Sequence, residues 1–515
     1  MWHIGDFPPR NHNPSSESLC SAAALRGGRR GRRPYTIPVI PIEIAVAAIA
    51  IVALAAYLLG KRHARRLQHA RRIRIDRFKL KRRHADIELE VFGSRDVVQA
   101  VQTYAKEHRV TTEEARRQAK TYLREIVPKF NLLAYYRFGA PIAKAIMHFL
   151  YRPVVERTLL RVFNDRAPKD SVVVYLINHR SNADYVLVSH MLFESISLSY
   201  AVGEWARVWP LNHVFKWFGA YFIRRRYREP LYHAVLSTFV RTITKHGVTQ
   251  GIFLEGGLTR DGAFLKPKLG MLDYIVQAKR DPEFTAPLFV IPTAINYDRV
   301  LEDRSLTEEL MKGRVKTTVD FLVRNFWRGV FRRFKRYGYA VVSFGSPIRV
   351  DDFIRDHPSI LAPEFENRKS ELQALAESVM REISAALPVT PVTLAARIFS
   401  EARDPLTNAD MIAAMDRYRS DWKHRVWLLR EKTGQELWRA AKRILDLRHL
   451  IEPVERWRSD LFEGEGVPVI EDAWRWSPEQ FLLRDYYANS LLTFEQVKAR
   501  GWPERGHQKL AERVV

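Results

Sequence analysis

Short β-branched runs alternate with helix-length segments between residues 170 and 350. The four runs are SVVVYLI (171–177), GIFLE (251–255), LFVIPTAI (288–295) and YAVVSFG (339–345). Segments such as 228–245 and 268–280 lie between them. This alternation predicts an α/β fold, a layered domain whose mixed, partly parallel sheet is flanked by helices. In open α/β sheets, functional side chains gather beyond the carboxyl ends of strands, so the residues after each run are the candidates.

The first polar cluster follows the run at 171–177. His179 comes two residues after that run, and Asp184 follows five residues later. An imidazole can take a proton from an alcohol at neutral pH, and a nearby carboxylate fixes its tautomer and stabilises the imidazolium. If a helix begins just after His179, Asp184 lies about one turn on, near the ring. The alternative is an ordinary polar turn closing a core strand, which the stretch Asn178-His179-Arg180-Ser181 alone favours.

Two further clusters point to anion binding. GAYFIRRRYREPLY (219–232) places three arginines after an apolar run, and the guanidinium fork suits a phosphate, although a solvated basic patch is the alternative. In GIFLEGGLTRDG (251–262), glycines at a strand end let backbone N–H groups approach an anion, although a simple β-turn is the alternative. The candidate residues of these two clusters are Arg224, Arg225, Glu255, Gly256, Thr259 and Arg260.

The fourth cluster is LFVIPTAINYDRV (288–300). We expect Pro292 to end a buried strand and, with Ile291, to leave an apolar rim that serves either a thioester's acyl chain or the core. Elsewhere no nucleophile-elbow, P-loop, dinucleotide or zinc-protease motif occurs. The single cysteine, Cys20, lies in the N-terminal tail, which excludes a cysteine nucleophile in the folded part. We expect no metal and no cofactor.

These four clusters, in this order within 125 residues, resemble the HxxxxD membrane acyltransferase superfamily. The blocks are NHRSNADY, GAYFIRR, FLEGGLTR and VIPTAINY, and VVSFGSPI (341–348) resembles the strand that closes the catalytic domain. The His-Arg-Ser form of the first block, the Phe-Ile-Arg-Arg of the second and the Glu-Gly-Gly of the third resemble bacterial glycerol-3-phosphate acyltransferase more than lysophosphatidate acyltransferase. The resemblance covers roughly residues 150–355.

The resemblance implies a role for each block. His179 would be the general base that deprotonates the sn-1 hydroxyl of glycerol 3-phosphate, and Asp184 would orient it. The alcohol would attack an acyl-CoA or acyl-carrier-protein thioester directly, giving lysophosphatidate without an acyl-enzyme. The implied substrate-binding residues are Arg180, Ser181, Arg224, Arg225, Glu255, Gly256, Thr259 and Arg260, and the implied acyl-donor residues are Ile291 and Pro292.

One departure from the family pattern leaves the acceptor open. The third block has Leu258 and Thr259 where the family often has Arg and Ser, so a hydroxyl is kept and a charge is lost. Dihydroxyacetone phosphate is a chemically close alternative acceptor, and lysophosphatidate is another. The same fold used as a hydrolase, with water as the acceptor, is a third.

The stretch IAVAAIAIVALAAYLL (44–59), with the apolar residues before it, reaches the length of about 20 residues that a bilayer span needs. We therefore expect a transmembrane segment at 37–60. A cleaved signal peptide is the alternative, but the run ends in Lys61-Arg62-His63 instead of a cleavage site. Residues 61–83 hold twelve Lys and Arg against five arginines in 26–33, which places the bulk of the chain on the cytoplasmic face of the inner membrane. A shallow interfacial hairpin, and hence monotopic attachment, is a further alternative.

The rest of the chain divides by composition. Residues 1–36 are predicted to be a disordered basic tail, 61–130 a basic juxtamembrane and helical region, 131–355 the catalytic domain, and 356–515 a helical accessory region. Within these, NLLAYYRFGAPIAKAIMHFLY (131–151) fits an interfacial helix and a buried core helix equally well.

The net charge of +26 suits a polyanionic partner. A non-enzymatic, membrane-tethered protein that binds lipid or nucleic acid is therefore the contrasting hypothesis. The sequence lacks a ribonucleoprotein or zinc-finger pattern, and a membrane span followed by basic residues accounts for much of the excess charge. We expect anionic membrane lipid as a partner and no nucleic acid.

Overall fold

The computed structural model describes residues 84–127, 140–192, 199–202, 221–224, 227–312, 336–422, 432–458 and 469–502. The chain divides into two compact units, Met1–Ala53 and Leu54–Val515, and all the described residues belong to the second. The predicted tail (1–36), the predicted transmembrane segment (37–60) and the basic stretch 61–83 lie outside the described residues. Within the described part, no helix is both long enough and apolar enough to cross a bilayer.

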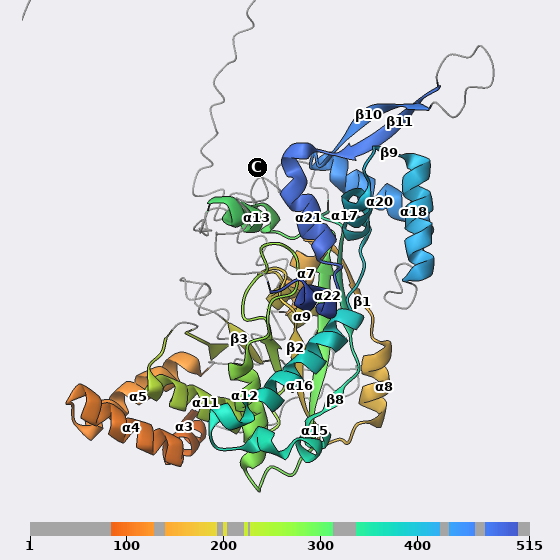
Figure 1. The fold of residues 1–515 in the computed structure, drawn as a ribbon. Coiled ribbons are helices and arrows are strands. Elements are labelled where there is room, and N and C mark those ends of the chain that lie inside the picture. The colour runs from red at the N-terminus through yellow and green to blue at the C-terminus, as the bar shows by residue number, and fades with distance from the viewer. Residues whose placement is uncertain are drawn as a thin grey trace, which may run out of the picture. The chain divides into compact units, whose positions relative to one another are not determined.

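A mixed sheet forms the centre of the second unit (Figure 1). Its described strands are β1 (Arg152–Val155), β2 (Val172–Ile177), β3 (Ser199–Val202), β4 (Tyr221–Phe222), β5 (Gln250–Phe253), β6 (Leu288–Tyr297), β7 (Tyr339–Phe344) and β8 (Ile348–Arg349). The order is β1-β7-β6-β2-β5-β3-β4, with β8 also on β6. The pairs from β6 through β2, β5 and β3 to β4 are parallel, whereas β7 and β8 run antiparallel to β6. The predicted mixed α/β sheet is confirmed.

The register of the parallel strands brings their carboxyl ends to one level. Ile177 of β2 lies opposite Phe253 of β5, and both are the last residues of their strands. β3 continues this register from Tyr200, opposite Gly251, to Val202, which lies opposite Phe222 at the end of β4. The segments that follow β2, β5 and β4, where the first three polar clusters lie, therefore leave the sheet at the same edge.

Strand β2 is buried on both faces, which explains its unbroken VVVYLI sequence. Val173, Tyr175 and Ile177 face one core and the alternate residues face another, as expected for a strand period of two. The first core contains α7 (Ala140–Leu150), α9 (Asp184–Leu192), α17 (Pro391–Glu401), α18 (Asn408–Asp421), α20 (Gly434–Leu447) and α21 (Phe481–Asn489). The second contains α11 (Pro230–Lys245), α12 (Leu269–Gln277), α15 (Val350–Asp356) and α16 (Phe365–Ala385).

The helical region predicted before the catalytic domain consists of α3 (His84–Gly93), α4 (Arg95–His108) and α5 (Thr112–Ile126). Thr111 caps α5 and forms a capping box with Glu114, as the Thr-then-acid start of TTEEARRQAKTYLREI indicates. The three helices pack on α11 and join the second core, so they extend the same body (Figure 1).

The C-terminal region differs from the expected helical accessory region in two ways. It contains a three-stranded antiparallel sheet of β9 (Leu406–Thr407), β10 (Ile451–Arg458) and β11 (Val469–Trp476), visible at the top of Figure 1. Its helices also belong to both cores that flank the central sheet, α16 to the second core and α17, α20 and α21 to the first. The remaining described elements are α8 (Thr158–Arg166), α13 (Asp303–Lys312), α22 (Phe494–Ala499) and 3-10 turns at Ala278–Arg280, Pro358–Leu361 and Pro478–Gln480.

The expectation that Pro292 ends a strand is wrong, because β6 runs through it to Tyr297. On the side away from β2, β6 pairs with β8 through residues 289–290 and with β7 through residues 293–297. Pro292 lies where one neighbour gives way to the other, and its carbonyl accepts a hydrogen bond from Gly345 N–H. The missing amide of proline is tolerated at such a gap in the ladder.

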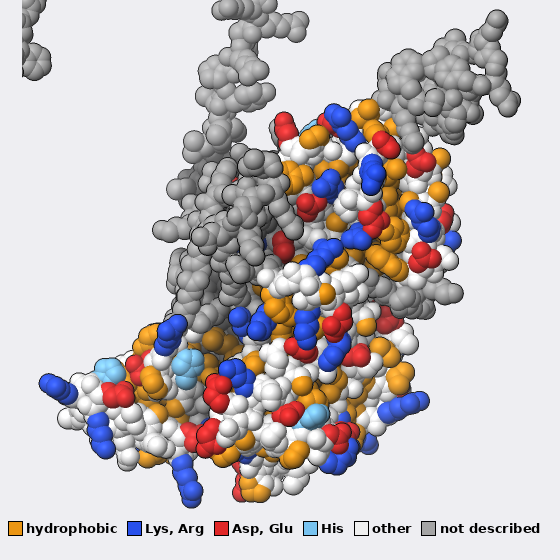
Figure 2. All heavy atoms as spheres, in the orientation of Figure 1, with side chains coloured by type: hydrophobic (Ala, Val, Ile, Leu, Met, Phe, Trp, Pro, Cys, Tyr) orange, Lys and Arg blue, Asp and Glu red, His pale blue; other side chains and the backbone are white. Residues whose placement is uncertain are grey.

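On the face that Figure 2 shows, acidic and basic side chains of the described residues are interspersed. Among the described residues, this face therefore presents no continuous basic track of the kind that a nucleic-acid backbone needs.

Candidate active site

His179 and Asp184 meet in the turn between β2 and α9. Nδ1 of His179 lies 3.0 Å from Oδ2 of Asp184, and both side chains are almost completely buried. The helix begins at Asp184 itself, not just after His179, and a turn closed by Asp184 N–H on the Ser181 carbonyl brings the two side chains together. The proximity that the spacing suggested thus arises from a turn and a helix N-terminus, where a carboxylate is favoured.

The Asp184 carboxylate is held by hydrogen bonds on both oxygens. Oδ2 also accepts from the backbone N–H groups of Arg180 (2.7 Å) and Ser181 (3.0 Å). Oδ1 accepts from the hydroxyl of Tyr297 (2.6 Å), the last residue of β6. The carboxylate is placed to accept a hydrogen bond from Nδ1–H of His179, and in that tautomer Nε2 carries the lone pair that can accept a proton.

The imidazole is fixed by aromatic rings as well. It stacks on Phe253 with ring centroids 4.1 Å apart, and Tyr185 of α9 meets it edge-on at 5.6 Å. Phe253 is the last residue of β5 and lies opposite the last residue of β2, so the register of the sheet places its ring beside His179. A base held this way needs little reorganisation before it reacts.

Glu255, two residues beyond β5, is buried beside the pair and accepts the backbone N–H of His179 at 3.2 Å on Oε2. Burial raises the pKa of its carboxyl to about 7, while the Arg180 guanidinium acts in the opposite direction. Its Oε1 has no hydrogen-bond partner within the described residues. Glu255 therefore anchors the backbone of the catalytic turn.

Arg180 points into the protein. Its guanidinium donates to the carbonyls of Gly262 and Ser490 and lies 5.1 Å from the centroid of the Phe264 ring. The side chain is only 1% exposed. Its two hydrogen bonds join the catalytic turn to the loop after β5 and to the end of α21. The resemblance implies that Arg180 binds substrate, whereas in the structure its guanidinium donates hydrogen bonds to backbone carbonyls of the protein.

Ser181, expected among the substrate-binding residues, donates its hydroxyl to Glu302 at 2.7 Å. Glu302 is buried and also accepts the backbone N–H of Asn182. Burial raises the pKa of Glu302 to about 7, against the opposing effect of the Ser181 hydrogen bond. The sequence analysis did not identify Glu302 and Tyr297 as site residues, although Tyr297 belongs to the fourth cluster. No local sequence pattern indicates that the end of β6 reaches the turn between β2 and α9.

Arg224 of the second cluster lies just beyond β4, at the same edge of the sheet. Its Nε and Nη2 form a two-pronged pair with Glu125 of α5 at 2.9 and 2.6 Å. Three tyrosine rings, those of Tyr122, Tyr227 and Tyr232, surround the guanidinium. Arg225 lies outside the described residues.

The third cluster forms a folded loop after β5. Gly256 has φ +65°, a left-handed conformation that favours glycine, and a Cβ there would meet the Lys268 side chain at 2.8 Å. Thr259 is buried and donates to Asp261, and Arg260 pairs with Glu309 of α13 at 3.1 Å. Arg260 and Arg224 thus pair with carboxylates on different helices.

The two residues assigned to the acyl donor lie inside the sheet. Ile291 and Pro292 stand opposite Tyr175 and Leu176 of β2 in the middle of β6, and Ile291 is fully buried. They lie within the sheet, two positions and one position before the level at which β2 ends at Ile177.

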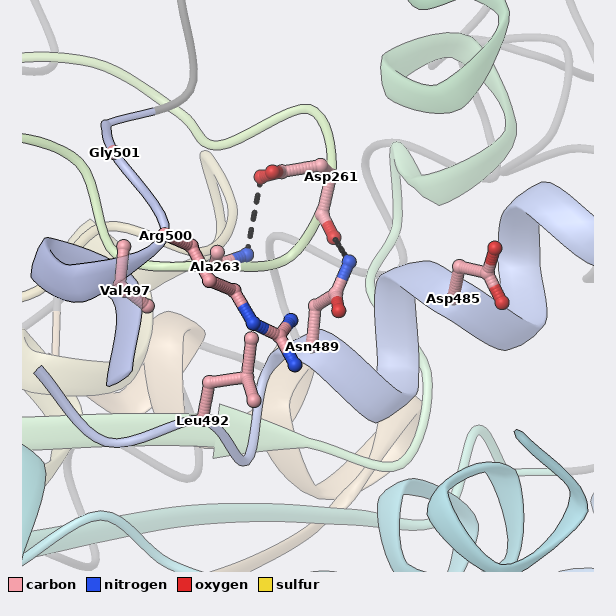
Figure 3. A pocket seen from close by; sticks show the side chains of 8 residues that line it. All are labelled: Asp261, Ala263, Asp485, Asn489, Leu492, Val497, Arg500 and Gly501. Atoms are coloured by element: carbon pink, nitrogen blue, oxygen red, sulfur yellow. Dashed lines mark hydrogen bonds between the residues drawn. The ribbon is translucent and has the colours of Figure 1, made fainter. Parts of the chain in front are cut away.

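A pocket of about 630 Å³ lies between the loop after β5 and the C-terminal helices α21 and α22 (Figure 3). In Figure 3 the Asn489 amide reaches the backbone carbonyl of Asp261, a 3.0 Å hydrogen bond, and the Arg500 side chain extends between them and Leu492. Neither His179 nor Asp184 lines this pocket. Its lining residues are Asp261, Ala263, Asp485, Asn489, Leu492, Val497, Arg500 and Gly501. Among the described residues, no group of three or more His, Cys, Asp or Glu is arranged to hold a metal ion.

Comparison with known proteins confirms the resemblance seen in the four clusters. Residues 160–296 match the family model described as Acyltransferase, and residues 323–496 match that of the glycerol-3-phosphate acyltransferase C-terminal region. The crystal structure of the 1-acyl-sn-glycerophosphate acyltransferase from Thermotoga maritima matches with a TM-score of 0.28 and 19% identity, over 57% of this chain and 94% of that chain.

Curated relatives share part of their length with this chain. The glycerol-3-phosphate acyltransferase of Aeromonas hydrophila is 29% identical over 339 residues, which are 64% of this chain and 41% of the relative. That of Pseudomonas paraeruginosa is 29% identical over 334 residues, 62% of this chain and 39% of the relative. The chain spans about two fifths of the length of these relatives. The chain therefore matches an acyltransferase family model followed by the model of the glycerol-3-phosphate acyltransferase C-terminal region, and bacterial glycerol-3-phosphate acyltransferases are its relatives.

Proposed function

We propose that the protein is a glycerol-3-phosphate 1-O-acyltransferase. It transfers a fatty acyl group from acyl-CoA or acyl-carrier protein to the sn-1 hydroxyl of glycerol 3-phosphate and forms lysophosphatidate for phospholipid synthesis. The observation that carries the proposal is the buried His179–Asp184 pair, 3.0 Å apart, at the carboxyl edge of the sheet. The matched family regions and the names of the relatives support the choice of reaction and acceptor.

The geometry suits a direct transfer with His179 as general base. Nε2 takes the proton of the sn-1 hydroxyl as its oxygen attacks the thioester carbonyl, and Asp184 balances the charge of the imidazolium. The new C–O bond forms, the C–S bond breaks, and the imidazolium returns the proton to the departing thiolate. Protons and electron pairs balance without a covalent enzyme intermediate.

In this proposal Arg224 holds the phosphate of the acceptor. Three strand spacings separate β4 from β2, about 14 Å, and the side chains of Arg224 and His179 start from the same level of the edge. Glu125 occupies Nε and Nη2 of Arg224, so Nη1 is the group that remains for a phosphate oxygen. Dihydroxyacetone phosphate offers the same phosphate and stays the alternative acceptor.

We further propose that the catalytic unit rests on the cytoplasmic face of the inner membrane through α7. This helix buries Ala143 and Met147 and exposes Ile142, Ile146 and Phe149 at helical spacing, so its outer face is apolar. Lys144 also lies on the exposed side. Such a helix suits the interface of an anionic bilayer. Because α7 packs on α9, which begins with Asp184, a lipid product would form close to that interface.

The membrane proposal is tested with a bimane label in the full chain, on a Cys20→Ser background. We expect bimane at Phe149→Cys to shift to a less polar emission when phosphatidylglycerol vesicles are added, and bimane at Leu89→Cys, an exposed position on α3, to stay unchanged. Equal emission at both positions would contradict docking through α7.

The reaction is tested with membranes containing the full chain, labelled glycerol 3-phosphate and palmitoyl-CoA. We expect labelled lysophosphatidate, and a loss of about 10²–10⁴-fold in turnover for His179→Ala. His357→Ala serves as the control, because His357 makes a similar pair with Glu371 but lies at the surface, and it should keep full turnover. Full activity of His179→Ala would exclude the proposed base. Product only with acyl-carrier protein or dihydroxyacetone phosphate would reassign the donor or acceptor, and thioester loss without an acceptor would indicate a hydrolase.

A further inference from the structure

Asp184 receives hydrogen bonds from two separate parts of the fold. Three groups of its own turn lie within hydrogen-bond distance of Oδ2. They are the ring Nδ1 of His179 and the backbone N–H groups of Arg180 and Ser181. Oδ1 receives the Tyr297 hydroxyl at 2.6 Å from the end of β6. Among the described residues, Tyr297 is therefore the donor that ties this carboxylate to another strand.

The Tyr297 hydroxyl is a permanent donor. The side chain is fully buried, and its ring packs on that of Tyr151 with centroids 5.3 Å apart. Burial, and next the charge of Asp184, hold the pKa of the Tyr297 phenol well above its ordinary value. The hydroxyl therefore keeps its proton over the whole range in which an imidazole titrates. It orients its partner and takes no part in the proton transfer.

We propose that Tyr297 is a positioning residue for the acyl transfer, which fixes Asp184 and through it sets the orientation and basicity of His179. A carboxylate that shares its charge with a phenol hydroxyl attracts an imidazolium less strongly. Without the hydroxyl, Oδ1 is left buried and unpaired, and Asp184 holds the proton on His179 more tightly. The kinetic part of this inference rests on the proposed function.

The test is Tyr297→Phe in the full chain, assayed for acyl transfer to glycerol 3-phosphate over a range of pH. We expect kcat to fall about 10–100-fold, as for other residues that orient a reacting group through hydrogen bonds. KM for both substrates should stay within about threefold, because the Tyr297 side chain is fully buried and its hydroxyl donates to Asp184. The acidic limb of the kcat/KM profile should move to higher pH. A purely structural loss would lower the active fraction equally at every pH.

Tyr151→Phe is the matched control. Tyr151 is as deeply buried as Tyr297 and touches its ring, but its hydroxyl donates to the Arg299 backbone carbonyl at 2.8 Å. Both variants should lower the urea midpoint to a similar degree. Tyr151→Phe should keep kcat within about twofold and leave the pH profile in place. Identical kinetics for the two variants would overturn the inference.

A double-mutant cycle with Asp184→Asn locates the effect. When the charge of Asp184 is gone, removing the Tyr297 hydroxyl should change kcat less than about twofold. A further loss of 10–100-fold in the Asn background would show that Tyr297 acts on something other than Asp184, and would overturn the inference.

The protonation of His179 can also be followed without the reaction, by 15N NMR of histidine-labelled full chain. The His179 signals are identified by their absence in His179→Ala. We expect their titration midpoint to rise in Tyr297→Phe and to stay in place in Tyr151→Phe. If the wild-type chain does not acylate glycerol 3-phosphate but this midpoint still moves, the proposed function fails and the role of Tyr297 stands. An unmoved midpoint overturns the inference in either case.

Discussion

The guanidinium of Arg180 donates a hydrogen bond to the backbone carbonyl of Ser490, 310 residues further along the chain, at 3.4 Å. It also donates to Gly262, in the loop that follows β5. One side chain next to His179 therefore joins the catalytic turn to the third cluster and to the C-terminal region. The C-terminal region is a structural part of the catalytic unit, not an appendage to it.

Arg180→Met should unfold more easily than the wild-type chain. Methionine keeps the apolar stem but leaves the carbonyls of Gly262 and Ser490 without their donor, which costs roughly 2–4 kcal/mol of unfolding free energy. Urea unfolding measures the change. Arg381→Met, at an exposed site on α16, is the control and should stay within about 0.5 kcal/mol of wild type. Equal midpoints for the two variants would contradict the role assigned to Arg180.

Gly262→Ala and Gly270→Ala should change stability in opposite directions. Gly262 has φ +84°, and a Cβ there would lie 1.8 Å from the backbone oxygen of Tyr486, so alanine must push α21 away at a cost of about 2 kcal/mol or more. Gly270 lies on α12 with ordinary φ and no atom within 4 Å of a Cβ. Alanine there should stabilise the helix by about 0.5–1 kcal/mol. Thermal or urea unfolding of both variants checks the prediction, which a neutral Gly262→Ala would contradict.

Stability should fall as pH rises from about 4.5 to 7. Burial raises the pKa of Glu302 from 4.5 to about 7, so in this window the folded chain holds a proton that the unfolded chain has released. The cost by pH 8 is on the order of 3 kcal/mol. Glu302→Gln keeps an acceptor for Ser181 but cannot ionise, so its unfolding free energy should fall less steeply across the window.

Urea unfolding at pH 5, 6, 7 and 8 compares the slopes. Glu255, whose pKa is also raised to about 7 by burial, contributes a second decline in the same direction and remains in the Glu302→Gln variant. Glu366→Gln, at an exposed site on α16, should follow the wild-type curve. The prediction is wrong if Glu302→Gln follows it too.

Arg224→Lys should weaken binding of the acceptor more than binding of the acyl donor. Lysine cannot pair with Glu125 through two parallel hydrogen bonds, so the cation loses its fixed position. Losing one charged hydrogen bond to phosphate corresponds to a rise of about 10–100-fold in KM for glycerol 3-phosphate. Arg381→Lys should leave both KM values unchanged. An equal rise in KM for both substrates would argue against a phosphate site at Arg224.

The sheet and the catalytic pair were accessible from sequence because both depend on local patterns. β2, β5, β6 and β7 appear as β-branched runs, and His179 and Asp184 are close enough in the chain for one turn to join them. Tyr297, Glu302 and Ser490 reach the same turn from more than 100 residues away. Such contacts depend on strand order and register, which one sequence does not encode in any local pattern.

The hairpin of β10 and β11 escaped prediction for a different reason. Both strands, IEPVERWR and VIEDAWRW, mix charged residues with apolar ones, and Pro453 interrupts the first. A proline argues against a central strand, but β10 is at the edge of its sheet, where the missing N–H is tolerated.

The division of the C-terminal helices between the two faces of β2 bears on how the protein is made. When the ribosome has released residues 150–355, the strands of the central sheet have emerged, while α16, α17, α20 and α21, which complete its two cores, are still to be synthesised. Until about residue 490 emerges, the nascent sheet packs only against helices made earlier, such as α7 and α9 in one core and α11 and α12 in the other, and each core lacks its C-terminal helices. Contacts between residues this distant in sequence form slowly, and the partly folded chain exposes apolar surface that is prone to aggregate. We therefore expect that newly made chains depend on chaperones until their final helices have docked.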